Sequence, residues 1–431
     1  MTDTPHHPPI APIAPIAGPA GSGKSHLHIP SVPARPGAQS DFSYLQLSPA
    51  GAMPRPAIDA SAADIGELSR GLVRVLDEAH RAVGPWQIPI EAATLKTGLR
   101  HMLLTRVFDR RMQRTQRQGR ISFYVQSTGE EAVSVASAMA LQPDDMLFPS
   151  YRNQGLFVAR GVPLVDLMCQ LLSNRGDMCK GRQLPVMYHS GPARIFTISG
   201  NLATQYPQAV GWAMAAAIKG EDHIAASWIG EGAAAEADFH HGLLFASVYR
   251  APVILNIVNN QWAISTFQGF AGGEEQSFAA RGPGFGIPGI RVDGNDFIAV
   301  YAVTDWAARR ARASQGPTLI ELVTYRAEAH STSDDPARYR PRDDYQHWPL
   351  GDPIERLKQH LIQAGQWSDA EHDSLTQQLE GGVESNWAEA MAQGKPEEGC
   401  TLDRRLMFED VFKEMPEHLR RQRDALLAER D

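Results

Sequence analysis

Short apolar runs alternate with helical patterns through the middle of this chain. Runs with the length and continuous hydrophobicity of strands buried in a parallel sheet lie at residues 145–148, 224–229, 253–258 and 318–325. After the second run, apolar or small residues recur at helical spacing, at Phe239, Gly242, Leu243 and Ala246. Residues 233–249 are therefore expected to form an amphipathic helix that stops before Pro252. The alternation predicts an α/β fold with a mainly parallel central sheet and helices on both faces.

Helical patterns also flank this region. Residues 92–118 place one apolar face on a long helix, made of Leu95, Leu99, Met102, Leu103, Val107 and Met112. The arginines of this helix are expected to face solvent or another subunit, namely Arg106, Arg110, Arg111, Arg114 and Arg117. Residues 65–76 and 209–219 are also expected to be helical, and residues 290–296 lead into a further helix.

Composition divides the chain into three parts. Residues 1–40 are expected to form an extended or disordered leader without a core, since 12 of the 30 prolines lie in the first 60 residues. Residues 41–345 are expected to form the α/β domain with N-terminal docking elements. Residues 346–431 contain helical patterns of mixed charge and are expected to form a region for subunit assembly.

The leader contains a match to the nucleotide-binding P-loop pattern at residues 18–25, GPAGSGKS. That pattern binds phosphate when a buried strand precedes it and a helix follows it. Prolines on both sides disfavour both elements here, so the match is interpreted as chance. A P-loop nucleotide-binding protein is the alternative from another functional class.

Polar side chains follow two of the predicted strands. Glu231 lies in the turn Gly230-Glu231-Gly232, and Asn260 follows the next strand. The carboxyl ends of parallel strands meet where open α/β sheets bind ligands, so these two side chains are expected to be neighbours. Carboxylate and amide oxygens suit Mg²⁺, which usually keeps phosphate ligands, and the adjacent helix start offers N–H groups to a phosphate. The pattern predicts a Mg²⁺-diphosphate site; an ordinary βαβ unit is the alternative.

The spacing of this motif carries more information. Glycine, acid and glycine, then 26 residues, then Asn-Asn resembles the thiamine diphosphate motif of the thiamine-dependent decarboxylases and 2-oxo acid dehydrogenases. Glu231 stands where most members have aspartate, and this resembles the branched-chain 2-oxo acid members. The resemblance extends over about residues 40–421. It implies the thiamine diphosphate-binding fold and the α subunit of a decarboxylating branched-chain 2-oxo acid dehydrogenase of bacterial type.

The resemblance assigns roles to individual residues. It implies that Glu231, Asn260 and the backbone carbonyl of Trp262 bind Mg²⁺. The cofactor contacts that it implies are Tyr151, Arg152, Gly200, Leu202, Gly230, Glu231, Gly232, Ala233, Asn260 and His330. It also implies potassium ligands in residues 198–205, namely Ser199, Asn201, Thr204 and Gln205, although Asn201 and Gly200 replace a proline and a serine of the relatives' loop.

His330 is the implied catalytic residue, as a proton donor or electrostatic partner during acyl transfer. Without the resemblance, Tyr151-Arg152 would be a surface turn, and Glu130-Glu131 would complement the dipole at a helix start. The sequence HSTSDD at residues 330–335 resembles branched-chain members, whereas pyruvate dehydrogenase α subunits tend to HSMSDP. A branched-chain 2-oxo acid is thus the implied substrate, with pyruvate or acetoin as alternatives. Ser331 occupies a position that mitochondrial relatives phosphorylate.

Composition limits the partners and the compartment. The formal net charge of −8 argues against nucleic acid, and no apolar run approaches the ~18–20 residues of a membrane span. Three cysteines and the lack of a recognisable targeting signal fit a bacterial cytoplasm. Thiamine enzymes also need a carboxylate on the aminopyrimidine, carried by a second α/β module. The chain has no such module, so the resemblance implies a β subunit in an α₂β₂ heterotetramer, together with a lipoyl-bearing acyltransferase core.

Overall fold

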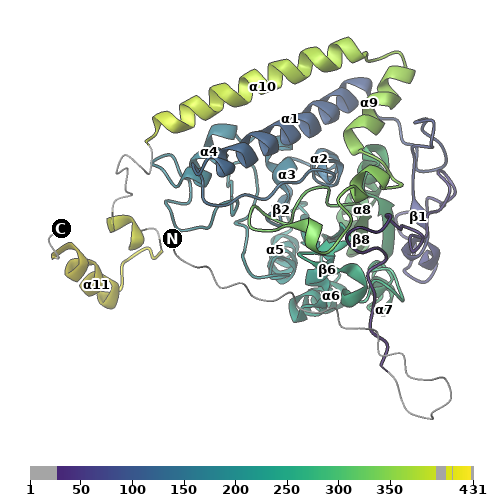
Figure 1. Cartoon of the computed structure of the whole chain (residues 1–431). Coiled ribbons are helices and arrows are strands. Elements are labelled where there is room, and N and C mark those ends of the chain that lie inside the picture. Colours follow the sequence, from purple (N-terminus) through teal and green to yellow (C-terminus); the bar gives the residue numbers. More distant parts are fainter. Residues whose placement is uncertain (1–26, 395–403, 410, 429–431) are drawn as a thin grey trace.

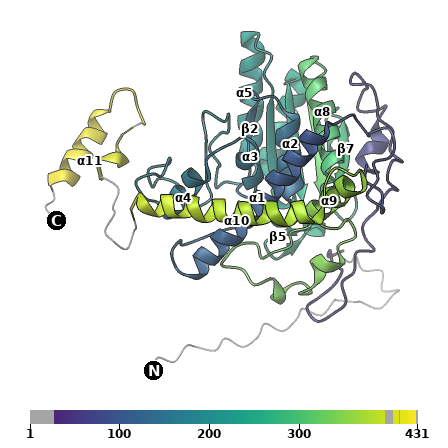
Figure 2. The same ribbon diagram turned by 90° about the horizontal axis from the view of Figure 1, so that it is seen from above.

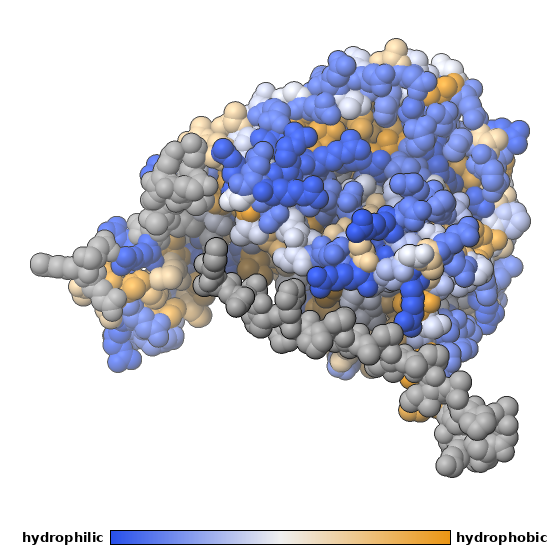
Figure 3. Space-filling model, viewed as in Figure 1, coloured by the Kyte–Doolittle hydropathy of each residue, from blue (hydrophilic) through white to orange (hydrophobic). Residues whose placement is uncertain are grey.

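The computed structural model describes residues 27–394, 404–409 and 411–428. The P-loop-like residues 18–25 lie outside the described residues. Helices cover both faces of one central sheet, as the two perpendicular views show (Figure 1, Figure 2). The face seen in Figure 3 is largely hydrophilic. The predicted α/β fold with a parallel sheet is confirmed.

The central sheet has six parallel strands in the order β1-β7-β8-β4-β3-β2. Its strands are β1 (Leu72–Val73), β2 (Met146–Phe148), β3 (Ala225–Gly230), β4 (Val253–Asn259), β7 (Gly289–Asp293) and β8 (Thr318–Val323). A separate antiparallel pair is formed by β5 (Trp262–Ala263) and β6 (Thr266–Phe267). The four strands expected from apolar runs are thus present, with ends shifted by at most two residues.

Eleven α-helices are present in the described residues. They are α1 (Ala92–Arg117), α2 (Glu131–Ala140), α3 (Gln154–Ala159), α4 (Leu164–Leu172), α5 (Gln205–Lys219), α6 (Ala237–Tyr249), α7 (Arg281–Gly284), α8 (Phe297–Arg312), α9 (Pro353–Gln363), α10 (Asp369–Ala392) and α11 (Glu417–Ala428). Helix α8 packs on one face of the sheet, with α2 against it and α1, α9 and α10 farther out. Helix α5 packs on the other face, with α6 against it.

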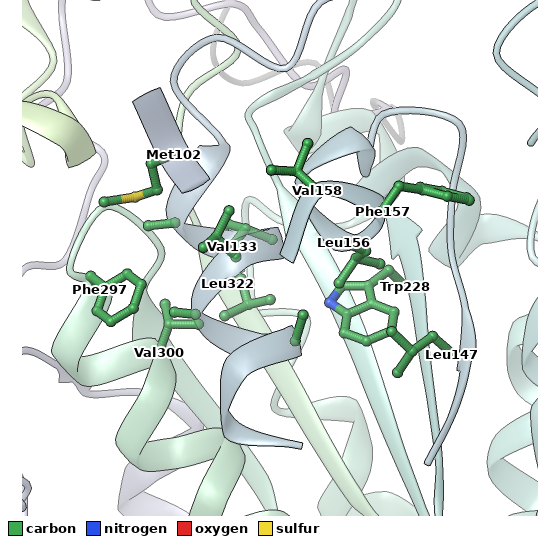
Figure 4. Packing of buried hydrophobic residues seen from close by; sticks show 14 of the residues in the cluster. Met102, Val133, Leu147, Leu156, Phe157, Val158, Trp228, Phe297, Val300 and Leu322 are labelled. Atoms are coloured by element: carbon green, nitrogen blue, oxygen red, sulfur yellow. The ribbon is translucent and has the colours of Figure 1, made fainter. Parts of the chain in front are cut away.

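Alternate side chains of β3 enter two different cores. Ala226 and Trp228 belong to the cluster that faces α2 and α8, whereas Ala225 and Ile229 belong to the cluster that faces α5 and α6. Figure 4 shows Trp228 between Leu156 of α3 and Leu147 of β2. A strand buried on both faces reads as a continuous apolar run, which explains why sequence pattern located it.

Two expected elements differ from the structure. Residues 65–76 form a 3₁₀ turn at Gly66–Ser69 followed by strand β1, instead of a helix. The glycines at 66 and 71 weaken a helix, while pairing with β7 satisfies the backbone of β1. Strand β7 was not predicted. The following helix α8 begins after Asp296, whose carboxylate accepts hydrogen bonds from the N–H groups of Ile298 and Ala299, both at 3.1 Å.

The helix expected over residues 233–249 is interrupted near its start. A 3₁₀ turn, η2 (Glu231–Ala235), precedes α6, and Glu236 separates the two. The buried face of α6 consists of the expected Phe239, Gly242, Leu243 and Ala246. The N–H groups that follow Glu231 therefore belong to a tight 3₁₀ turn at the edge of the sheet.

The expectation that the arginines of α1 face solvent is wrong for Arg106. This side chain is buried, and it pairs with Glu131 at 2.6 Å and with Asp352 at 2.7 Å. Glu131 belongs to α2, and Asp352 precedes α9, so both partners come from elements distant in sequence. Arg110, Arg114 and Arg117 are exposed, as expected.

The described part of the expected leader, residues 27–40, adds side chains to the interior, which the expectation of a leader without a core did not include. Residues 27–40 form no helix or strand, but Ala34 is buried and Val32 packs against an aromatic cluster. At the other end, α9 and α10 pack against α1. Within the described part of the chain, no helix is long and apolar enough to cross a bilayer.

Candidate cofactor and metal site

The register of the sheet brings the two halves of the predicted motif together. Gly230 at the end of β3 is paired with Val258 of β4, and Asn259 is paired with Val323 at the end of β8. The chain leaves all three strands at the same edge of the sheet. The N–H of Asn260 accordingly donates a hydrogen bond of 3.4 Å to the carboxylate of Glu231.

A cavity of about 570 Å³ opens at this edge. Of the residues predicted for the site, those that line it are Tyr151, Arg152, Ser199, Gly200, Asn201, Leu202, Gln205, Gly230, Glu231, Gly232, Ala233, Asn260, Trp262 and His330. Thr204 does not line it, and its hydroxyl donates to the carbonyl of Asn201 at 3.1 Å. The structure thus gathers residues spread over 180 positions of sequence into one space.

Glu231 has the properties of a ligand to a cation. Its side chain is buried, and its Oε1 atom has no hydrogen-bond partner among the described residues. Burial raises the pKa of this carboxyl to about 7. A buried polar atom without a partner costs ~1–3 kcal/mol, and a bound cation would offset that cost.

The chemistry of the donor set fits magnesium held jointly with a diphosphate. The described residues contain no group of three or more His, Cys, Asp or Glu side chains that could hold a metal by themselves. Mg²⁺ typically uses one or two carboxylates and completes its shell with phosphate oxygens and water. One carboxylate from Glu231, the amide of Asn260 and a backbone carbonyl match that requirement.

Glu130 orients Asn260, and sequence reasoning missed it. Its Oε1 accepts a hydrogen bond of 2.8 Å from Nδ2 of Asn260. This fixes which end of the amide is nitrogen, so a cation would meet the amide oxygen of Asn260, which accepts one hydrogen bond, from the N–H of Trp262 at 3.3 Å, and has a second lone pair. Glu130 and Glu131 stand at the start of α2, as expected, but Glu130 is buried and bonds to Asn260 instead of capping the helix. The available signal was a pair of carboxylates in an otherwise apolar stretch.

Arg326 is a second site residue without a sequence-based role. Its guanidinium is buried and donates to the carbonyl of Trp262 at 2.7 Å and to that of Ile264 at 2.8 Å. Burial, with the charge of Arg152 next, lowers its pKa to about 10. The carbonyl of Trp262 has a second lone pair, so this bond does not exclude a metal.

Arg152 and His330 meet at the same end of the cavity. Arg152 is 5% exposed, so Tyr151-Arg152 is not a surface turn. Its guanidinium donates to the carbonyl of Gln126 at 2.6 Å and to that of His330 at 2.8 Å. The guanidinium of Arg152 at one end of a largely uncharged cavity suits the oxygens of a phosphate, and the buried Arg326 adds a second positive charge next to His330.

His330 is neutral in this arrangement. Its Nδ1 lies 3.2 Å from Nη2 of Arg152 and 3.4 Å from Nη1 of Arg326. Both arginines can only donate, so Nδ1 accepts and the ring proton is assigned to Nε2. Burial, followed by the two positive charges, lowers the pKa of His330 to about 3. The ring of Tyr151 lies edge-on to it, with centroids 5.9 Å apart.

The rest of the site is shaped by a close contact between two loops at Gly232 and by hydrogen bonds in the loop before α5. A Cβ added to Gly232 would lie 2.5 Å from Cβ of Ala263, so only glycine lets the two loops meet here. In the loop before α5, the hydroxyl of Ser199 accepts from the N–H of Asn201 at 3.1 Å. Gln205 donates to the carbonyl of Trp228 at 2.9 Å, and its buried Oε1 lacks a partner among the described residues.

The raised pKa of Glu231 gives a prediction for metal binding. Mg²⁺ requires the ionised carboxylate, so its affinity in the presence of thiamine diphosphate should fall as the pH drops below about 7, by roughly tenfold per unit for each proton displaced. Above that pH the affinity should level off. Calorimetric titrations in buffers of different ionisation enthalpy measure the released protons. Equal affinity and no proton release between about pH 6 and pH 8 would contradict the prediction.

Comparison with known proteins agrees with this geometry. The family model described as dehydrogenase E1 component matches residues 99–398, and the model described as 2-oxoisovalerate dehydrogenase E1 alpha subunit N terminal matches residues 24–63. The 2-oxoisovalerate dehydrogenase subunit alpha of Pseudomonas aeruginosa is 57% identical over 400 residues, which cover 93% of this chain and 98% of the relative. The mitochondrial protein of that name from Mus musculus is 41% identical over 359 residues, or 82% of this chain and 79% of the relative.

The matches extend over most of the chain and include residues 24–63 near its N-terminus. A relative from Dictyostelium discoideum, also named 2-oxoisovalerate dehydrogenase subunit alpha, is 43% identical over 301 residues, covering 68% of this chain and 67% of the relative. The residues that meet at the edge of the sheet lie within the larger family match. The chain belongs to the dehydrogenase E1 component family, whose members depend on thiamine diphosphate.

Proposed function

We propose that this chain is the α subunit of a branched-chain 2-oxo acid dehydrogenase, 3-methyl-2-oxobutanoate dehydrogenase (2-methylpropanoyl-transferring). It oxidatively decarboxylates branched-chain 2-oxo acids with thiamine diphosphate and Mg²⁺, and transfers the acyl group to a lipoyl domain. The observation that carries the proposal is the unpartnered, buried Oε1 of Glu231 beside Asn260, in a cavity that Arg152 and His330 also line.

The proposed roles follow the contacts. Glu231, the amide oxygen of Asn260 and the carbonyl of Trp262 hold Mg²⁺ against the diphosphate. Arg152 and the N–H groups of Gly232 and Ala233 bind the diphosphate oxygens. Bound thiamine diphosphate would supply a nucleophilic carbon for the 2-oxo group and a sink for the electron pair that remains when the bond to CO₂ breaks. His330 donates or stabilises a proton during acyl transfer through Nε2.

The walls of the cavity favour a branched aliphatic substrate. Away from Arg152, apolar side chains line it, namely Phe123, Val125, Leu184, Val186, Met187, Leu202 and Ile264. Burying each additional CH₂ against such a wall contributes roughly 0.8 kcal/mol, so the three-carbon isopropyl group of 2-oxoisovalerate gains over the methyl group of pyruvate. Ser199, Asn201, Thr204 and Gln205 are proposed to hold K⁺ beside this wall.

The proposed partners follow from the carboxylate that thiamine enzymes need on the aminopyrimidine, which the resemblance assigns to a second α/β module. A β subunit supplies the carboxylate for the aminopyrimidine and completes an α₂β₂ heterotetramer, with the α/β domain at 41–345 and an assembly region at 346–431. A lipoyl-bearing acyltransferase accepts the acyl group. A bacterial cytoplasm is the proposed compartment.

The decisive experiment is co-expression with a candidate β chain. The purified complex is expected to bind Mg²⁺-thiamine diphosphate and to turn over 2-oxoisovalerate with a kcat/KM at least about tenfold above that for pyruvate, since two or more CH₂ groups are buried. Steady-state rates across straight and branched 2-oxo acids measure this. An equal or higher kcat/KM with pyruvate or acetoin would show that the chain belongs to a pyruvate or an acetoin dehydrogenase instead.

The isolated chain is the matched comparison. It should bind the cofactor weakly and decarboxylate little, because the second half of the site is absent. Robust turnover of 2-oxoisovalerate by the isolated chain would refute the proposed dependence on β.

A further inference from the structure

We propose that the N-terminal segment, residues 40–47, positions the metal-binding loop, residues 259–262, through Tyr44 and Gln261. Neither side chain lines the cavity, so both are positioning residues and not ligands. The inference rests on the proposed function, because it concerns the loop proposed to hold Mg²⁺.

Gln261 holds a backbone conformation that its residue type disfavours. Its φ is +76°, in the left-handed region that favours glycine. It lies between the two residues whose oxygens are proposed as metal ligands, Asn260 and Trp262. Backbone strain of this kind persists only where surrounding contacts impose it, and it concentrates at functional sites.

The contacts that impose it come from the Gln261 side chain, which is fully buried. Its Nε2 donates to the carbonyl of Asn259 at 3.0 Å and to that of Thr324 at 3.2 Å. Its backbone N–H donates to the side chain of Asn259 at 3.3 Å. These bonds tie the loop to itself and to the residue that follows β8, and they leave Oε1 of Gln261 to be satisfied from elsewhere.

The N-terminal segment satisfies that atom. The hydroxyl of Tyr44 donates to Oε1 of Gln261 at 3.1 Å, across 217 residues of sequence. The bond fixes the amide so that Nε2 points at the two carbonyls. In Figure 1 the purple N-terminal segment crosses the ribbon beside β6 and β8, in agreement with this contact.

Aromatic packing holds the segment in place. The ring of Phe42 lies edge-on to Tyr325 and to Trp348, with centroids 5.7 Å and 5.2 Å apart. Tyr44 packs edge-on to Phe267 at 5.1 Å, and Phe267 in turn contacts Trp262 at 5.5 Å. A polar and an apolar route therefore connect residues 40–47 to the metal-binding loop.

The test uses the α₂β₂ enzyme and three variants. Tyr44→Phe removes one hydroxyl and keeps the ring, so the dissociation constant for Mg²⁺-thiamine diphosphate should rise roughly three- to tenfold. Gln261→Ala removes the side-chain bonds and keeps a disfavoured φ, so it should weaken binding more. Gln261→Gly removes the same bonds but adopts this φ freely, so it should fall between Gln261→Ala and the wild type. The KM for 2-oxoisovalerate should stay unchanged in all three.

Tyr345→Phe is the matched control, because it removes a hydroxyl from the same aromatic cluster, but one that donates to Asp352 at 2.6 Å and not to residues 259–262. It should leave cofactor affinity at the wild-type value. Wild-type affinity in both Tyr44→Phe and Gln261→Ala would overturn the inference while leaving the proposed function intact. A loss of thermal stability in the cofactor-free variants without a change in cofactor affinity would also overturn it, since the contact would then be merely structural. A wild-type enzyme that fails to bind Mg²⁺-thiamine diphosphate would refute the proposed function itself.

Discussion

Replacing Glu231 with glutamine is expected to weaken the binding of Mg²⁺-thiamine diphosphate by on the order of 100-fold or more and to abolish turnover at ordinary cofactor concentrations. Loss of residues that only orient metal ligands typically costs about 10- to 100-fold in affinity, and a charged ligand should cost more. The amide keeps the shape of the side chain but supplies no negative charge. A fluorescence or calorimetric titration of the α₂β₂ enzyme measures the effect.

The same variant should not destabilise the cofactor-free protein. Burial raises the pKa of Glu231 from 4.5 to about 7, so the carboxyl costs stability increasingly as the pH rises from 4.5 to about 7. Glutamine removes that cost, so the variant should be at least as heat-stable as the wild type near neutral pH. Glu236→Gln is the control, since Glu236 is exposed and makes no side-chain capping bond. Cofactor affinity within about twofold of wild type in Glu231→Gln would remove Glu231 from the metal site.

Replacing His330 with glutamine is expected to lower the rate of lipoyl acylation by roughly 10²- to 10⁴-fold, the usual contribution of a positioned acid or base. Glutamine can still accept a hydrogen bond from Arg152 but cannot exchange a proton, so cofactor affinity should change little. Single-turnover acylation of a lipoyl domain measures the step. Decarboxylation followed with an artificial electron acceptor should be affected much less.

The pKa of His330 in the wild-type enzyme should also depend on whether the cofactor is bound. Burial, and after it the charges of Arg152 and Arg326, lower it to about 3 here, and a bound diphosphate would offset those charges and raise it. His347→Gln is the control, because His347 lies in the same region of the chain and its side chain is 57% exposed. Equal losses in acylation and decarboxylation would contradict a role confined to acyl transfer.

The sequence by itself located four strands of the six-stranded sheet and the side-chain ligands of the proposed metal site. Strands buried on both faces appear as continuous apolar runs, and the carboxyl ends of parallel strands meet at one edge. Those two regularities suffice to place Glu231 beside Asn260. The helical spacing of Phe239, Gly242, Leu243 and Ala246 likewise gave the buried face of α6.

Only the tertiary structure decided which charged groups are paired. Arg106 belongs to a helix face that looks solvated, but the fold buries it against Glu131 and Asp352. Glu130 is a carboxylate at a helix start, as its sequence indicates, but only the fold places it on the amide of Asn260, 130 residues away. Periodicity reports how one segment distributes its burial, and it contains no information on which distant segment supplies the partner.

Long-range contacts also determine the elements that sequence pattern did not predict, namely strands β1 and β7 and the turn at Gln261. Strands β1 and β7 are short, and their pairing with each other and with β8 defines them more than their composition does. The left-handed turn at Gln261 is stable because a buried side-chain network and Tyr44 surround it. Sequence pattern therefore determined the fold class and the ligand types, whereas the long-range contacts determined how the ligands are oriented and charged, because these depend on the partners that the folded chain supplies.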